Sequence, residues 1–341
     1  MPSSQTFPGS NPILASKPLA PEFTVAICTY NGENRLPEVL ERLRSQVNTE
    51  HFHWEILLVD NNSTDQTAEL IRNYQLDWPQ EYPIRYLFEA QQGSAYARQR
   101  AVQEAKSELI GFLDDDNIPA LDWVAAAYDF AQTHPRAGAY ASQIHGDFEV
   151  EPPRNFKRIA GFLAITERGP EPLLYNPRKK LLPPSAGLVV RKSVWGQHVP
   201  QTFTLKGRVG QSQGQAIAAS EPGEDLELLL HIQNAGWEIW YNPDMEMHHK
   251  IPQWRFERDY LITMFRGIGL SRYYTRMLSV KPWQRPIAAL AYILNDIRKI
   301  VWHWLKYRTR IRRDLVATCE MELFRHSLLS PFHHWKKILR Q

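Results

Sequence analysis

Four short apolar runs, each followed by polar residues, constrain the fold of this chain more than any other feature. The runs cover residues 23–28, 55–59, 84–88 and 109–113. Apolar residues at helical spacing stand between them, at 36–47, at 70–74 and at 94–105. Short apolar runs rich in β-branched residues are typical of buried strands. Strands that alternate with helices predict βαβ units, so we expect an α/β fold with a mostly parallel sheet.

Polar residues directly follow three of these expected strands. Tyr30 follows the first strand, Asp60 the second, and the triplet 114–116 the fourth. The carboxyl ends of parallel strands meet at one edge of a sheet, and ligands bind where that edge opens. We therefore expect one binding site built from these residues, although Asp60 could equally serve the turn that it begins.

The triplet Asp114, Asp115 and Asp116 indicates a divalent cation. Three adjacent carboxylates repel one another unless a cation or solvent offsets their charge. Mg²⁺ prefers carboxylate oxygens together with substrate phosphates. A solvated turn or a helix cap is the alternative, but the apolar strand just before the triplet argues against it. A metal here would neutralise a leaving diphosphate.

Two further pairs could carry chemistry. Glu224 and Asp225 begin an expected helix at 224–235, where the helix dipole favours acidic residues and where a carboxylate could also act as a general base. His248 and His249 follow a short extended segment at 245–249. They are either structural or complete a metal site that Asp116 begins.

After residue 117 the pattern is less regular. We expect a helix at 123–133, strands at 187–191 and 237–241, and a mobile loop or lid at 203–220. Residues 1–21 are rich in Ser and Pro and predict a disordered arm. Two cysteines are too few for a disulfide scaffold and favour a cytoplasmic protein.

The C-terminal end is helical in pattern and strongly basic. Residues 251–341 hold 18 Lys and Arg against 6 Asp and Glu, whereas residues 1–250 hold 22 against 31. The helical pattern runs from 254, with interruptions at Pro282 and Pro286. Since no nucleic-acid-binding module accompanies the charge, we expect no nucleic acid partner.

An apolar stripe at 286–304 precedes a cluster of arginines. The stripe consists of Ile287, Leu290, Ala291, Leu294, Ile297, Val301 and Trp304, and the cluster of Arg308, Arg310, Arg312 and Arg313. Charged residues inside the stripe argue against a spanning helix. Either the stripe packs on the catalytic core, or residues 286–313 contact an anionic membrane surface peripherally, on the inner face of the plasma membrane.

The order and spacing of these motifs resemble the inverting family 2 glycosyltransferases. The resemblance covers residues 22–250 and is carried by 25–31 (VAICTYN), 57–67, 93–100, 111–117, 184–191 and 223–230. It implies a GT-A fold, with a Rossmann-like, mostly parallel sheet flanked by helices and a helical C-terminal extension. The layout also resembles the hormogonium polysaccharide glycosyltransferases of filamentous cyanobacteria.

The resemblance implies three regions and a donor site. Residues 22–250 would form the catalytic domain, with 22–117 as the nucleotide-sugar donor half and 118–250 as the acceptor half, followed by the basic helical region 251–341. Side chains of the donor site would contact the nucleotide sugar. These are Cys28, Thr29, Tyr30, Asp60, Arg98, Asp114, Asp115 and Glu224.

The resemblance also implies the catalytic roles. Asp225 would be the catalytic base, and Asp116 would bind Mn²⁺ or Mg²⁺, with His248 preferred over His249 as a second contact. The Gln-x-x-Arg-Trp signature of processive synthases is absent, and we interpret residues 252–256 (PQWRF) as a chance echo of it.

The implied reaction moves one sugar from a nucleoside-diphosphate sugar, with UDP favoured, to a hydroxyl of a glycan or lipid-linked glycan, with inversion. Exopolysaccharide or cell-surface glycan biosynthesis is the expected pathway. A nucleotidyltransferase would leave Asp225 without a role. A catalytically inactive glycan-binding or scaffold protein is the non-enzymatic alternative.

Overall fold

The computed structural model describes residues 20–177, 181–205, 207 and 222–339. Nearly all of the predicted arm at 1–21 and most of the predicted lid at 203–220 lie outside these residues. The four predicted strands are present and mutually parallel, in the order β3-β2-β1-β4. Their bounds are Phe23–Thr29 (β1), Trp54–Asp60 (β2), Ile84–Phe88 (β3) and Leu109–Asp114 (β4). The expected parallel sheet is therefore confirmed.

The sheet continues beyond β4 with strands of mixed direction. Its order runs on as β8-β6-β9-β5, and β7 also pairs with β9. β8 is antiparallel to β4 and β6, whereas β6 and β9 are parallel to each other. The bounds are Asn117–Pro119 (β5), Ala137–Phe148 (β6), Leu173–Leu174 (β7), Leu188–Arg191 (β8) and Glu238–Ile251 (β9).

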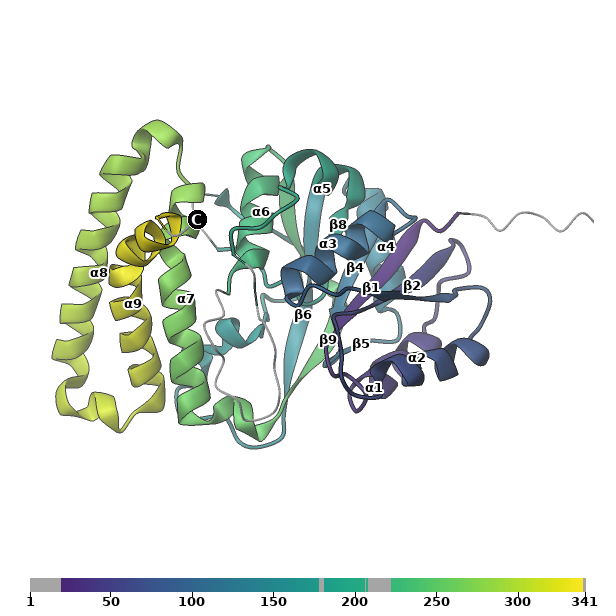
Figure 1. The fold of residues 1–341 in the computed structure, drawn as a ribbon, viewed down its shortest axis with the longest axis horizontal. Helices are drawn as coiled ribbons and strands as arrows, with labels where there is room; N and C mark the ends of the chain where they lie inside the picture. The colour runs from purple at the N-terminus through teal and green to yellow at the C-terminus, as the bar shows by residue number, and fades with distance from the viewer. Residues whose placement is uncertain (1–19, 178–180, 206, 208–221, 340–341) are drawn as a thin grey trace, which may run out of the picture.

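Two layers of helices cover the sheet (Figure 1). Buried side chains of α1, α2 and α4 pack on one face, and those of α3, α5 and α6 pack on the other. The bounds are Leu36–Arg44 (α1), Thr67–Leu76 (α2), Ser94–Glu104 (α3), Trp123–Thr133 (α4), Lys192–His198 (α5) and Glu224–Asn234 (α6). Because both faces are covered, the strands' carboxyl ends are the open part of this layer structure.

Three long helices stand beside this α/β body at one side of the molecule (Figure 1). They are α7 (Arg258–Leu278), α8 (Arg285–Tyr307) and α9 (Leu315–Ile338). α7 and α9 share an apolar core that includes Phe265 and Leu323. Gly269 permits their close approach, since a Cβ there would lie 2.9 Å from the backbone oxygen of Leu323. Pro286 lies in the first turn of α8, where proline is tolerated, so it begins this helix and does not interrupt it.

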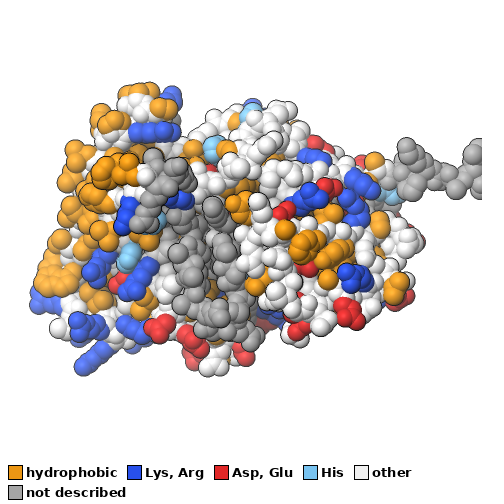
Figure 2. Space-filling view, in the orientation of Figure 1, with side chains coloured by type: hydrophobic (Ala, Val, Ile, Leu, Met, Phe, Trp, Pro, Cys, Tyr) orange, Lys and Arg blue, Asp and Glu red, His pale blue; other side chains and the backbone are white. Residues whose placement is uncertain are grey.

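The apolar stripe of α8 does not pack on the catalytic core. Ile287 is 74% exposed, Leu290 60% and Trp304 55%, whereas the buried residues of α8 are Asp296 and His303. The helix thus turns its polar side inward and its apolar side outward, the reverse of an ordinary surface helix. Figure 2 shows hydrophobic side chains gathered over this side of the molecule. Of our two expectations for the stripe, packing on the core is therefore wrong.

Candidate active site

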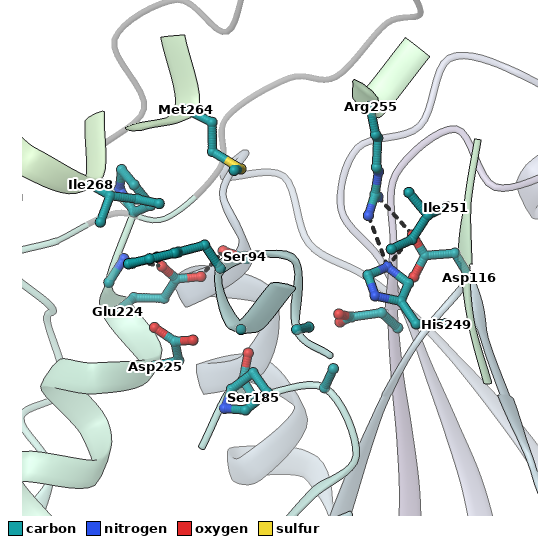
Figure 3. Close-up of a pocket in the computed structure, with 18 of the residues that line it drawn as sticks. Ser94, Asp116, Ser185, Glu224, Asp225, His249, Ile251, Arg255, Met264 and Ile268 are labelled. Atoms are coloured by element: carbon teal, nitrogen blue, oxygen red, sulfur yellow. Dashed lines mark hydrogen bonds and ion pairs between the residues drawn. The ribbon is translucent and has the colours of Figure 1, made fainter. Parts of the chain in front are cut away.

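A cavity of about 1790 Å³ opens at the carboxyl ends of β1 and β4 and extends to α7 and α8. Cys28, Thr29 and Tyr30 at the end of β1 line it, as do the three aspartates after β4. The start of α6, with Glu224 and Asp225, lines it from another side (Figure 3). Sites for one drug-sized ligand usually occupy about 300–1,000 Å³, so this cavity has room for two substrates.

Asp115 is held in place by a cation that the sequence analysis did not single out. Arg35 donates to both carboxylate oxygens, from Nε at 2.9 Å and from Nη2 at 2.8 Å, and Thr29 donates a further hydrogen bond. Burial raises the pKa of the Asp115 carboxyl, and the hydrogen bond from Arg35 opposes that effect. Arg35 lies just before α1. The sequence analysis missed it because Arg35 and Asp115 are far apart along the chain.

Asp60 lies beside the cavity and is not among the residues that line it. Its Oδ1 accepts from the backbone N–H of Ser63 at 2.9 Å, and its Oδ2 accepts from the Tyr86 hydroxyl at 2.8 Å. The neighbouring Asn61 does line the cavity. The structure thus places Asp60 at the end of β2, where its side chain bonds the turn that follows, and a contact with a nucleobase is a proposal.

Arg98 joins the two halves of the site. This buried guanidinium lies 3.4 Å from an oxygen of Asp114 and 3.0 Å from an oxygen of Glu224. Ser94 also donates to Glu224. Burial raises the pKa of the nearby Cys28 thiol to about 12, so this cysteine is present as the neutral thiol. The network fixes Glu224 as an anchor between α3 and α6.

The position of Asp225 follows from this anchor. Gly223, just before α6, has a φ of 120°, in a region that favours glycine. The chain therefore turns sharply into the helix, and Glu224 is held by Arg98 while Asp225 lines the cavity. Figure 3 shows the Asp225 carboxylate across the cavity from Asp116.

Asp116 forms a cluster with His249 and Arg255. Nε2 of His249 lies 3.5 Å from Oδ2 of Asp116, and Nδ1 of His249 lies 3.0 Å from the backbone oxygen of Leu163. Because a carbonyl oxygen can only accept, Nδ1 carries the proton, and the unprotonated Nε2 is left to accept a hydrogen bond. Arg255 donates to both groups, at 2.7 Å to Asp116 and 2.8 Å to His249 (Figure 3).

We expected His248 near Asp116, but the residue that lies beside Asp116 is His249. Neighbouring residues of a strand point to opposite faces, and on β9 it is His249 that faces Asp116. His248 is exposed, and its ring lies 5.4 Å from that of His145. No signal in the sequence separates two adjacent histidines, because the answer depends on how β9 pairs.

We interpreted residues 252–256 as a chance echo, but the structure places two of them at the site. Arg255 is buried and reaches two of the site residues, and Trp254 lines the cavity. The sequence signal was present in the Gln-Trp-Arg run that follows β9. It does not match the spacing of the processive signature, but its arginine occupies the site.

Comparisons with known proteins agree with this geometry. Residues 24–189 match the family described as Glycosyl transferase family 2. A curated relative, the undecaprenyl-phosphate 4-deoxy-4-formamido-L-arabinose transferase of Pectobacterium carotovorum, is 32% identical over 117 residues, which are 32% of this chain and 36% of the relative. The chain spans between a quarter and about a third of the length of three curated relatives that it matches.

Two solved structures share the fold over most of the chain. The mannosyltransferase PcManGT from Pyrobaculum calidifontis, in complex with GDP-Man and Mn²⁺, is 17% identical, with a TM-score of 0.54 over 93% of this chain and 88% of that one. S. aureus TarS 1-349, in complex with UDP-GlcNAc, is 14% identical, with a TM-score of 0.50 over 93% and 92%. The fold is the GT-A fold, as the resemblance of motifs predicted.

Proposed function

We propose, from the match of residues 24–189 to family 2 of the glycosyl transferases, that this chain moves one sugar from a nucleoside-diphosphate sugar to an acceptor hydroxyl. UDP is the expected diphosphate, as in the UDP-GlcNAc complex of the TarS structure. Residues 22–250 would form the catalytic domain and residues 251–341 its helical extension. The carrying observation is the Arg98 network, which holds Asp225 across the cavity from the aspartates after β4.

In this mechanism Asp225 takes the proton from the acceptor hydroxyl as its oxygen attacks the anomeric carbon. The leaving diphosphate departs from the opposite side, so the configuration inverts. Glu224 is excluded as the base because Arg98 and Ser94 engage its carboxylate. Arg98 orients the start of α6.

The residues around Asp116 fit a divalent cation. One carboxylate oxygen and the unprotonated imidazole nitrogen both accept from Arg255, so a cation in the place of this guanidinium would meet two suitable ligands. The hydrogen bond to Leu163 fixes the tautomer that binds a metal. Within the described residues no cluster of three or more His, Cys, Asp and Glu forms a site, so diphosphate oxygens and water would complete it. Asp116 and His249 would hold Mn²⁺ or Mg²⁺, and the cation would neutralise the leaving diphosphate.

The acceptor is proposed to be a glycan or a lipid-linked glycan at a membrane. The relative from Pectobacterium carries undecaprenyl phosphate in its name. Within the residues that the structure describes, no helix combines the length and hydrophobicity of a membrane span. The exposed apolar side of α8 and the arginines that follow it support peripheral contact with an anionic membrane, on its cytoplasmic face. Exopolysaccharide or cell-surface glycan synthesis is the corresponding pathway.

A thermal-shift panel tests the proposal. UDP, GDP, CDP and dTDP are each added with Mn²⁺, Mg²⁺ or EDTA, and the melting temperature of the folded protein is followed. A ligand that binds only the native state raises that temperature. We expect a shift with UDP that EDTA removes. No shift with any diphosphate would contradict a donor site and favour the inactive glycan-binding alternative.

A further inference from the structure

Three cations lie together at the end of the cavity that is formed by α7 and α8. Arg272 and Arg276 come from successive turns of α7, and Lys299 comes from α8; all three line the cavity and are half-buried. Tyr292 and Asn295 of α8 line the same part. None of these residues belongs to the donor site described above.

The charge of this cluster is only partly balanced. Asp296 is fully buried and is bound through both oxygens by Arg276, at 2.5 and 2.8 Å. The carboxylate of Asp296 also acts on Arg272 and Lys299, whereas Arg276 acts on both as a like charge. Arg272 makes one long hydrogen bond, 3.4 Å to the hydroxyl of Ser327. One carboxylate therefore faces three cations.

Burial and the crowding of positive charge lower the pKa of both Arg272 and Lys299. Burial, together with the neighbouring Arg276, lowers the pKa of Arg272 to about 10. Burial and the two arginines also lower the pKa of Lys299. Like charges gathered in a partly buried pocket are unfavourable in the absence of an anion, and a bound anion would relieve that repulsion.

The cluster lies close to the proposed base. A Cβ built on Gly223, directly before α6, would lie 3.7 Å from the hydroxyl oxygen of Ser271 and 3.9 Å from a methyl group of Thr275. Ser271 directly precedes Arg272, and Thr275 directly precedes Arg276. If the anionic group of an acceptor bound to the cluster, the remainder of the acceptor would lie beside the start of α6, where Asp225 is located.

We propose that Arg272, Arg276 and Lys299 form a binding site for a phosphate ester of the acceptor, separate from the donor site. Guanidinium groups bind phosphate oxygens in pairs, and an ammonium adds a point charge, so this set of donors suits a phosphate. The inference rests on the proposed function and deepens it, since it assigns the acceptor a phosphate. The outer side of the same helix α8 is the exposed apolar stripe, which suits a phosphate that is attached to a lipid.

The test measures binding of three probes by titration calorimetry: farnesyl phosphate, glycerol 3-phosphate and farnesol. The variant carries Arg272→Gln and Lys299→Gln together, which leaves the Arg276–Asp296 pair intact. The control is Arg298→Gln, which removes one positive charge from an exposed position next to Lys299. We expect wild type and control to bind both phosphates and the double variant to bind each at least about tenfold more weakly. If farnesyl phosphate binds more tightly than glycerol 3-phosphate, the phosphate belongs to a lipid; equal affinity assigns it to a soluble glycan.

Two further readouts separate this inference from folding and from the proposed function. Because the substitutions remove repulsion, the melting temperature of the double variant should equal or exceed that of wild type. The shift with UDP and Mn²⁺ should stay unchanged, since the donor site is intact. Unaltered farnesyl phosphate binding in the double variant would overturn the phosphate site, whereas a missing UDP shift in wild type would contradict the proposed function instead.

Discussion

At the scale of single residues, the site is organised by arginines that neutralise carboxylates. Arg35 holds Asp115, Arg98 holds Asp114 and Glu224, and Arg255 holds Asp116. Asp225, the neighbour of Glu224, lines the cavity, and its Oδ1 accepts from the backbone N–H of Leu226 at 2.8 Å. A carboxylate bound by arginine is a poor proton acceptor, so Glu224 is unsuited to act as the base, and we propose its neighbour Asp225 for that role.

Replacement of Asp225 tests its assignment as the proposed base. Asp225→Asn keeps the size of the side chain and removes its basicity, so kcat should fall by roughly a hundredfold or more. The affinity for UDP with Mn²⁺ should be unchanged, because the donor groups lie on other elements. Steady-state kinetics and calorimetry measure the two quantities. A variant with the wild-type kcat would contradict the assignment.

Removal of Arg255 tests the proposed metal site. In Arg255→Gln the largely buried Asp116 carboxylate loses its guanidinium partner, which should destabilise the metal-free protein by about 2 kcal/mol. A divalent cation can take over that neutralising role, so Mn²⁺ should raise the melting temperature more in the variant than in wild type. His249→Ala is the companion variant and should lower the response to Mn²⁺. An equal Mn²⁺ response in wild type and Arg255→Gln would show that Arg255 and the metal do not share a place.

At the scale of elements, local patterns predicted the first half of the fold well and the second half poorly. β1, β2 and β4 are largely apolar runs because helices bury them on both faces, and such runs are visible in the sequence. β6 was missed, and β9 was expected as two pieces. Their pairing shifts register between Ser142 and Gln143, which breaks the regular alternation that sequence patterns rely on.

The candidate site divides in the same way. The residues at strand ends and at the start of α6 were predicted because each belongs to a local motif. Arg35 and Arg255 were missed because their partners lie far away in sequence, and the order of strands alone brings them together. The face of β9 that carries His249 likewise depends on pairing with β6 and β5.

The inverted polarity of α8 leads to a prediction for this helix. If its apolar side contacts a membrane, Leu290→Ser together with Trp302→Ser should weaken binding to vesicles of anionic phospholipid by roughly tenfold or more. The melting temperature should stay within about 2 °C of wild type, since both side chains are exposed and bury little surface on folding. Vesicle co-sedimentation and thermal denaturation supply the measurements. A large loss of stability would instead indicate that the stripe packs within the protein.

At the scale of the whole molecule, negative and positive charge are separated: residues 1–250 are acidic and residues 251–341 are basic. Residues 1–250 carry a net −9 and residues 251–341 a net +12. The α/β body would be repelled by an anionic surface to which the helical part is attracted, so the molecule would approach with α7 to α9 foremost. The cavity reaches α7 and α8, and this orientation brings its proposed phosphate site toward the membrane.

Salt dependence tests this orientation. Electrostatic attraction to a membrane falls off within a Debye length, which shrinks from about 10 Å at 0.1 M salt to about 3 Å at 1 M. Binding to anionic vesicles should therefore weaken strongly over that range. Replacement of Arg308, Arg310, Arg312 and Arg313 by Gln should remove most of the salt-sensitive part, at about 1 kcal/mol for each charge near the surface. The apolar contribution of α8 should persist in this variant, because hydrophobic burial does not depend on those charges. If the fourfold variant kept the full salt dependence, the orienting charge would have to lie elsewhere on the molecule, and the helical part would not face the membrane.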